Sequence, residues 1–142
     1  MTTPITGIDT LLPDGWPRGQ GYANGIAATG RTIFVSGQIG WNPLTAQLET
    51  DDFAEQVAQT LRNIVAVLRA GGAEPSHLVR LTWFITDKPA YMATRHEIGR
   101  VYREIIGRHF PAMSVVVVSA LVEDRAKVEI EATAVVPDGA AA

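Results

Sequence analysis

The chain has 142 residues, of which 46% are hydrophobic and 19% charged, so it is long enough for one domain with a substantial core and too short for two. It has no cysteine, which excludes disulfides, thiolate metal ligands and a cysteine nucleophile and fits a cytoplasmic, reducing compartment. A formal net charge of −3 argues against nucleic-acid binding, which usually needs a basic surface. The sequence also predicts no signal peptide and no membrane span.

The first part of the chain is predicted to contain loops and two strands. Residues 1–21 are rich in Pro, Gly and Thr without any period, which predicts a surface arm. Residues 22–28 and 32–37 are predicted as strands that form a hairpin, because Gly30 between them can adopt the positive φ of a tight turn. Residues 40–47, which include a proline, are predicted as a loop.

The clearest periodic signal is a helix that follows Asp51 or Asp52 and ends at Gly71-Gly72. Aspartate is a good N-cap, and glycine accepts the left-handed backbone conformation that often ends a helix. The apolar residues of this helix recur at helical spacing: Phe53, Val57, Leu61, Ile64, Val65 and Leu68.

The second half of the chain adds three strands and one helix. Residues 78–86, 113–121 and 127–136 are rich in β-branched and apolar residues and are predicted as strands. Asp87 is predicted to cap the second helix, with Pro89 in its first turn. The apolar face of that helix is formed by Ile98, Val101, Tyr102 and Ile105.

The element order ββαβαββ predicts a single α+β domain over residues 1–142, with a loose tail at 137–142. Several strands are apolar on both sides: Phe34 alternates with apolar neighbours, as does Phe84, and residues 115–118 are all valine. Two helices can cover only one face of such a sheet, so we expect further copies of the chain to cover the other. The alternative is a sandwich with one helix on each face.

The last strand carries two carboxylates whose surroundings depend on that second face. Glu129 and Glu131 alternate with apolar residues, and at a subunit junction such a carboxylate needs a partner, or its pKa rises and it can shuttle protons. The alternative is that they form ion pairs with Lys127, Arg80 or another basic neighbour.

Two further sets of side chains are given no functional role. The three histidines share no metal-ligand spacing, so no metal site is expected. The second helix carries four arginines diluted by Glu97 and Glu104, which is typical of a solvated helix face. These residues are His77, His96 and His109, and Arg95, Arg100, Arg103 and Arg108.

The chain has a Ser-Gly-Gln strand end at residues 36–38 and a Val-Glu-Ile-Glu-Ala strand at residues 128–132. Together with further segments between residues 21 and 135, these resemble the RidA/YjgF family, also called L-PSP endoribonucleases. The resemblance implies a chorismate-mutase-like fold of the bacillus type, with two helices on one sheet face and a homotrimer that buries the other. It also implies a cleft at each subunit boundary and cofactor-free hydrolysis of imines and enamines, such as 2-aminoacrylate, to keto acids and ammonia. The matching segments are 21–22, 33–39, 42–43, 56, 61–64, 67–68, 71–73, 78–82, 111–112 and 128–134.

The resemblance assigns roles to residues of this cleft. Glu129 would orient the attacking water and act as a general base, with Tyr22 as the second catalytic residue. Without the resemblance, Tyr22 is interpreted as a packing residue and Ser36 as a residue of a strand-end turn. Trp83 is either a packing residue or part of the cleft wall. The substrate-binding residues are predicted to be Ser36, Gly37, Trp83, Met113 and Ser114.

Two positions depart from the family pattern. Met113 stands where the family has an arginine that binds the substrate carboxylate, and a thioether can neither carry charge nor donate a hydrogen bond. Losing that contact predicts a rate lower by roughly 10²-fold or more. Gly99 stands where an asparagine is common.

We therefore expect a hydrolase of imine-like or related small metabolites with weak or no activity on 2-aminoacrylate. Its ligand either lacks a carboxylate or has it bound by another base, such as Arg31 or Arg80. The alternative is a non-catalytic protein that binds a small metabolite in an apolar cleft around Met113. The acidic composition disfavours a third possibility, a ribonuclease.

Overall fold

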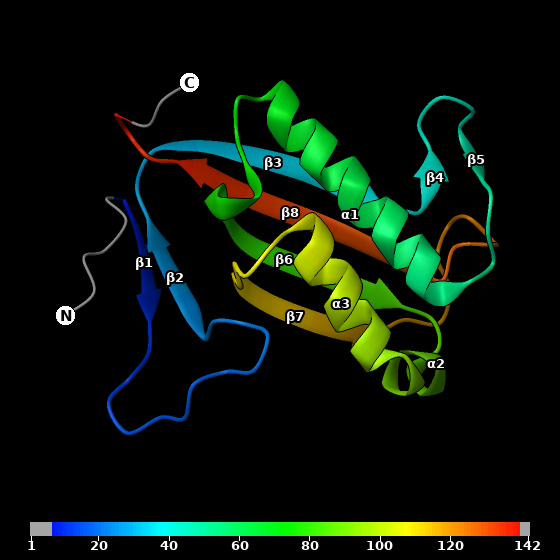
Figure 1. Cartoon of the computed structure of the whole chain (residues 1–142), viewed down its shortest axis with the longest axis horizontal. Coiled ribbons are helices and arrows are strands. Elements are labelled where there is room, and N and C mark those ends of the chain that lie inside the picture. Colours follow the sequence, from blue (N-terminus) through cyan, green and yellow to red (C-terminus); the bar gives the residue numbers. More distant parts are fainter. Residues whose placement is uncertain (1–6, 140–142) are drawn as a thin grey trace.

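The computed structural model describes residues 7–139, which fold into an open sheet with helices packed on one side (Figure 1). The sheet order is β3-β8-β6-β7; β8 is antiparallel to both neighbours, and β6 and β7 are parallel. The elements in chain order are β1 (Ile8–Leu11), β2 (Gly25–Ala28), β3 (Arg31–Gln38), β4 (Trp41–Asn42), β5 (Gln47–Leu48), α1 (Phe53–Ala70), a 3₁₀ turn η1 (Pro75–His77), β6 (Leu78–Ile85), α2 (Lys88–Ala93), α3 (Arg95–Ile105), β7 (Ala112–Val117) and β8 (Val128–Val136).

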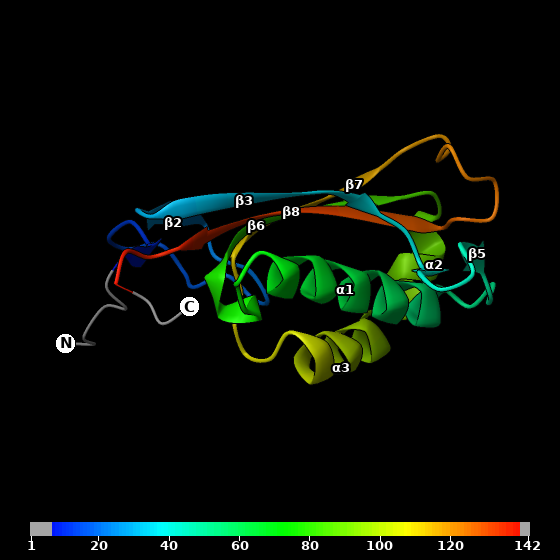
Figure 2. The same cartoon turned by 90° about the horizontal axis from the view of Figure 1, so that it is seen from above.

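Helices α1 and α3 lie on the same side of the sheet, and the opposite side is uncovered (Figure 2). The predicted α+β fold with its helices on one face is therefore confirmed, and the alternative sandwich is wrong. The core lies between α1 and strands β3, β6 and β8, where Leu61, Ile64, Leu81 and Ile130 are fully buried. Apolar burial of this kind is the main contribution to folding stability.

The first helix begins and ends as the sequence predicts. Asp52 is its N-cap, and its carboxylate accepts a hydrogen bond of 3.0 Å from the backbone N–H of Glu55. At the other end Gly71 is the C-cap and Gly72 has a φ of 77°, which favours glycine. Both signals are local, which is why the sequence alone could define this helix.

The predicted hairpin of the first two strands is wrong. Gly30 has a φ of 150° and turns the chain, but β2 pairs with β1, and β3 pairs with β8 at the edge of the main sheet. The predicted arm therefore contributes a strand, because residues 8–11 satisfy the backbone groups of β2. The first six residues of that arm, and the tail from residue 140 on, lie outside the described residues.

Three other boundaries differ from the prediction. The loop at 40–47 contains the short antiparallel pair β4–β5. The second helix is divided at Thr94, whose φ and ψ of −111° and 12° are not helical and whose hydroxyl donates to the backbone carbonyl of Ala90 at 2.8 Å; such bonds of Thr compete with helix continuation. Strand β7 ends at Val117 rather than at residue 121.

The uncovered face of the sheet is less apolar than the strand patterns predict. Phe34 is 79% exposed there, but its partner in the register on β8 is Thr133. Further along the same face, Thr82 pairs with Glu131, and Phe84 pairs with Glu129. The face thus carries apolar and carboxylate side chains together.

Candidate functional site

The predicted site residues do not all lie together in the single chain. Ser36, Gly37 and Glu129 lie together at the ends of β3 and β8 on the uncovered face. Met113 and Trp83 face the helices, whereas Ser114, next along β7, points to the other side because strand side chains alternate.

Tyr22 lies at the opposite end of the sheet from Glu129. Its neighbour Ala23 pairs with Ala112 at the start of β7, which pairs with Arg80, whereas Glu129 pairs with Phe84, roughly 13 Å further along β6 at the rise of a strand. Within one chain, therefore, the two predicted catalytic residues are not brought together.

A glycine creates the space occupied by the Glu129 carboxylate. The register between β3 and β8 is interrupted between Val35 and Gln38, and Gly37 lies in this irregular segment. A Cβ atom at Gly37 would overlap the carboxylate of Glu129, so any other residue would displace it. Gly37 thus allows the close approach of β3 to the carboxylate, and its part in a substrate site stays a prediction.

Neither carboxylate of the last strand forms an ion pair within residues 7–139. The alternative expectation of pairs with Lys127 or Arg80 is therefore wrong for this part of the chain. The Lys127 ammonium donates to the backbone carbonyl of Asp51 instead. Arg80 lines a cavity of about 370 Å³ on the uncovered face together with Phe34 and Glu131.

A second cavity of about 360 Å³ lies between β7, the end of β6 and α3. Its sheet side is formed by Trp83, Met113 and Val115. Trp83 is 3% exposed, and its Nε1 is the one buried side-chain N or O atom without a hydrogen-bond partner among the described residues. An unpaired buried donor is rare in native proteins and costs about 1–3 kcal/mol.

The helix side of this cavity is rigid and aromatic. The ring of Tyr102 stacks on that of Phe110 at a centroid distance of 5.5 Å, and its hydroxyl donates to the carbonyl of His109 at 2.6 Å. Burial raises the pKa of Tyr102, so the phenol stays protonated and serves as a hydrogen-bond donor rather than as a base.

Arg95 and Arg103 of α3 are exposed, as predicted for a solvated helix face, and both also line this cavity. Arg100 fits the prediction, because it pairs with Glu104 at 2.9 Å and Glu97 at 3.8 Å. The spacing of four residues between 95, 99 and 103 was the available signal, since it places all three on one helix face.

The two bases proposed from the sequence to replace the missing arginine do not line this cavity. Arg31 donates to the backbone carbonyl of Gly71 at 2.7 Å, next to the C-terminal end of α1. Arg80 lies on the uncovered face. Arg95 and Arg103 are thus the basic residues next to Met113.

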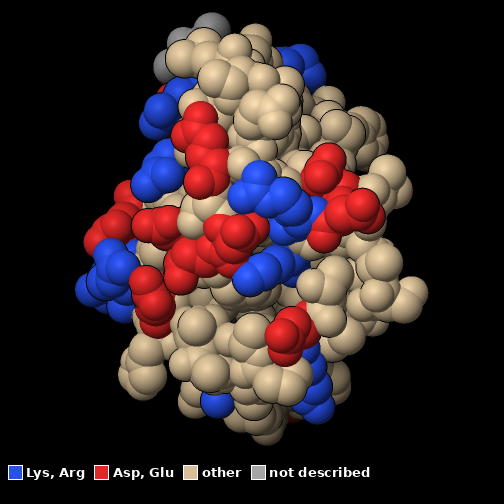
Figure 3. Space-filling model, turned by 90° about the vertical axis from the view of Figure 1, so that its right-hand side faces the viewer, with Lys and Arg blue, Asp and Glu red and all other residues tan. Residues whose placement is uncertain are grey.

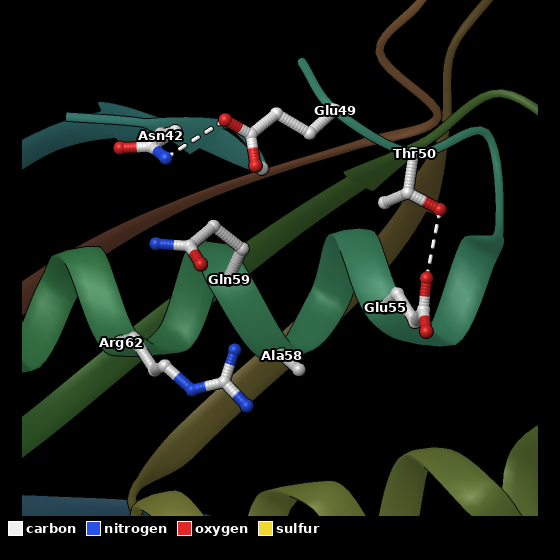
Figure 4. Close-up of a pocket in the computed structure, with 8 residues that line it drawn as sticks. Asn42, Glu49, Thr50, Glu55, Ala58, Gln59 and Arg62 are labelled. Carbon is white, nitrogen blue, oxygen red and sulfur yellow. Dashed lines mark hydrogen bonds between the residues drawn. The ribbon is translucent and has the colours of Figure 1, made fainter. Parts of the chain in front are cut away.

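A third cavity, of about 340 Å³, lies between the β4–β5 loop and α1 (Figure 4). Its polar groups are largely satisfied: Asn42 donates to Glu49 at 2.8 Å, and Thr50 donates to Glu55 at 2.8 Å. None of the predicted site residues lies here.

The charges on the side of the molecule that carries β4, β5 and α2 are of both signs and interspersed (Figure 3). No three His, Asp or Glu side chains converge into a metal-binding group within the described range. No helix in that range is long and apolar enough to span a membrane.

Comparison with known proteins places this chain in a family. The family described as Endoribonuclease L-PSP matches residues 17–136. Human 2-iminobutanoate/2-iminopropanoate deaminase is 32% identical over 105 residues, which are 74% of this chain and 73% of the human protein.

Solved structures agree. A protein of the Rid family from Yersinia pestis, YyfB, has a TM-score of 0.81 and 29% identity and covers 92% of this chain and 100% of its own. E. coli TdcF with bound serine has a TM-score of 0.65 and 31% identity over 90% of this chain and 98% of its own. This chain therefore belongs to the endoribonuclease L-PSP family, which is also the RidA/YjgF family.

Proposed function

We propose that this protein hydrolyses imine- or enamine-like small metabolites in clefts between copies of the chain, with weak or no activity on 2-aminoacrylate. The observation that carries the proposal is the Glu129 carboxylate, which has no ion-pair partner among the described residues and occupies space left by Gly37. The imine deaminase activity of the human relative supports the reaction type.

In the proposed reaction Glu129 accepts a proton from a water molecule while the water oxygen bonds to the imine carbon. The protonated carboxyl group then returns the proton to the nitrogen, which gives a carbinolamine. Glu129 next takes the proton of the new hydroxyl group and passes it to the nitrogen, so the carbon–nitrogen bond breaks and a carbonyl compound and ammonia leave. General acid–base catalysis of this kind contributes typically about 10²–10⁴-fold to the rate. The step needs no metal or organic cofactor.

The positions of Glu129 and Met113 in the single chain support association of several copies. Glu129 projects from the uncovered face of the sheet, whereas Met113 lies on the helix side at the sheet edge. The two residues can therefore share a cleft only if the uncovered face of one copy packs against the sheet edge of the next. Such a head-to-tail contact is heterologous, and it gives a closed ring when the rotation from one copy to the next closes after a whole number of copies. We therefore propose a homotrimer, in which Phe34 and the exposed valines of β7 are covered.

The role of Glu129 is tested by ammonia release from imines generated with an amino-acid oxidase. We expect Glu129→Gln to lower the rate by about 10²-fold or more. Glu131→Gln is the matched control, because Glu131 is two residues away on the same strand face, and it should retain the rate. Equal rates for the wild type and Glu129→Gln would contradict the proposal.

Met113→Arg tests the low activity on 2-aminoacrylate. A guanidinium can bind a carboxylate through two charge-assisted hydrogen bonds, so this variant should hydrolyse enzymatically generated 2-aminoacrylate faster than the wild type. Fast hydrolysis of 2-aminoacrylate by the wild-type protein would contradict the proposal that Met113 limits this activity.

The second candidate function is binding without catalysis. It is favoured by the apolar surroundings of Met113, which packs against the core, because thioether side chains suit adaptable apolar pockets. Saturable binding of a metabolite without any ammonia release, in a cytoplasmic extract or with pure protein, would favour it over the hydrolase.

A further inference from the structure

We propose that Arg95 and Arg103 form an anion-binding site on the cavity beside β7, and that its ligand is a small carboxylate with an apolar, aromatic body. The inference rests on the proposed function in treating this cavity as part of the cleft, but binding can be measured without turnover.

The geometry of α3 makes room for this site. Arg95, Gly99 and Arg103 share one face of the helix and line the cavity. A Cβ atom at Gly99 would lie 3.3 Å from Nη1 of Arg103, which is tighter than ordinary contact, so a larger residue would push the guanidinium aside. Glycine is otherwise unfavourable inside a helix, and here its lack of a side chain leaves space for Arg103.

The charges of these two arginines are not neutralised by the chain. Within residues 7–139 neither Arg95 nor Arg103 takes part in an ion pair or a side-chain hydrogen bond, whereas Arg100 on the adjacent face is paired with two glutamates. The cavity has no carboxylate among its lining residues. Guanidinium groups in this setting favour a carboxylate, which they can bind through two parallel hydrogen bonds.

The walls of the cavity indicate that the part of the ligand beyond the carboxylate is apolar and aromatic. Trp83, Met113 and Phe110 give it apolar and aromatic surfaces, and its volume of about 360 Å³ lies in the range of small-molecule sites. A short carboxylate that binds the arginines would leave much of this surface wet.

Calorimetric titration with three probes tests the ligand class. We expect 3-phenylpropanoate to bind at least about tenfold more tightly than 3-phenylpropanol, which lacks the charge, and than propanoate, which lacks the ring. Its affinity should fall with added salt, because partly exposed charges are screened. Equal affinities for 3-phenylpropanoate and 3-phenylpropanol would overturn the inference.

Charge-removing variants test the residues. Arg103→Gln and Arg95→Gln should each weaken 3-phenylpropanoate at least about tenfold, while Arg100→Gln, which removes the same charge from the same helix, should not. An equal loss in Arg100→Gln would mean that the effect is one of net charge and would overturn the site. Circular dichroism checks that each variant is folded.

Two readouts separate this inference from the proposed reaction. In a protein whose Trp16 and Trp41 are replaced by Phe, 3-phenylpropanoate should change the fluorescence of the remaining Trp83. Arginine-dependent binding without any ammonia release would leave this site standing and overturn the proposed reaction. If the wild type and Arg103→Gln released ammonia from an aromatic imino acid with the same KM, the proposed reaction would stand and the arginine site would be overturned.

Discussion

The side chain of Gln56 connects the start of α1 to the segment that carries Glu129, and its replacement gives a testable loss of stability. Gln56 is fully buried. Its Nε2 donates to the backbone carbonyls of Thr50 at 3.0 Å and Arg125 at 3.1 Å, and its Oε1 accepts from the backbone N–H of Lys127 at 2.8 Å. Lys127 lies just before β8, so these bonds fix the entry of the strand.

Gln56→Leu keeps the volume of the side chain but removes all three hydrogen bonds. At about 0.5–1.5 kcal/mol for each bond, the expected loss in the free energy of unfolding is roughly 1.5–4.5 kcal/mol. The measurement is equilibrium unfolding in urea followed by circular dichroism, at one protein concentration because association would couple to folding. Ammonia release should fall as well, because Glu129 loses its support.

The matched control is Gln59→Leu on the same helix. Gln59 makes one side-chain hydrogen bond, from Nε2 to Oδ1 of Asn63 at 2.9 Å, so we expect a loss of about 1 kcal/mol or less. If Gln56→Leu lowered the free energy of unfolding by no more than Gln59→Leu, the three hydrogen bonds would not stabilise the start of β8 as described.

Three further predictions follow from the same geometry. Gly37→Ala should displace the Glu129 carboxylate and lower ammonia release while the circular dichroism spectrum is unchanged. Phe34→Lys should shift the molar mass measured by light scattering toward the monomer, because it puts a charge on a side chain that is 79% exposed in the single chain. Burial raises the pKa of Tyr102, so the folded chain keeps a proton that the unfolded chain loses near pH 10. The free energy of unfolding should therefore keep its full value below that pH and fall above it. The fall should be less steep in Tyr102→Phe.

Each of these three predictions can be contradicted by a specific result. An unchanged rate in Gly37→Ala would mean that the carboxylate does not need that space. A wild-type protein that is monomeric in dilute buffer would remove the proposed cleft along with the role of Phe34. Identical alkaline stability profiles for the wild type and Tyr102→Phe would mean that the phenol does not contribute to the pH dependence.

Much of the fold was predictable because its signals are local. The α1 helix has an apolar residue on every turn, an aspartate at its start and two glycines at its end, and such signals act within a few residues. The break at Thr94 was not predicted, since threonine is tolerated within helices and only its hydrogen bond to Ala90 marks the break. The pairing of β2 with β1 was missed because partners in a sheet are chosen by the whole fold.

The family, the placement of the helices on one sheet face and the candidate residues Gly37, Glu129 and Met113 were predictable from the sequence, because they depend on residue type and order along the chain. The fold was needed to show that Glu129 and Met113 project to opposite faces of the sheet, and that the exposed Arg103 lines the same cavity as Met113. The physical reason is that the direction of a side chain depends on strand register and helix packing. Both are set by contacts between residues far apart in the sequence.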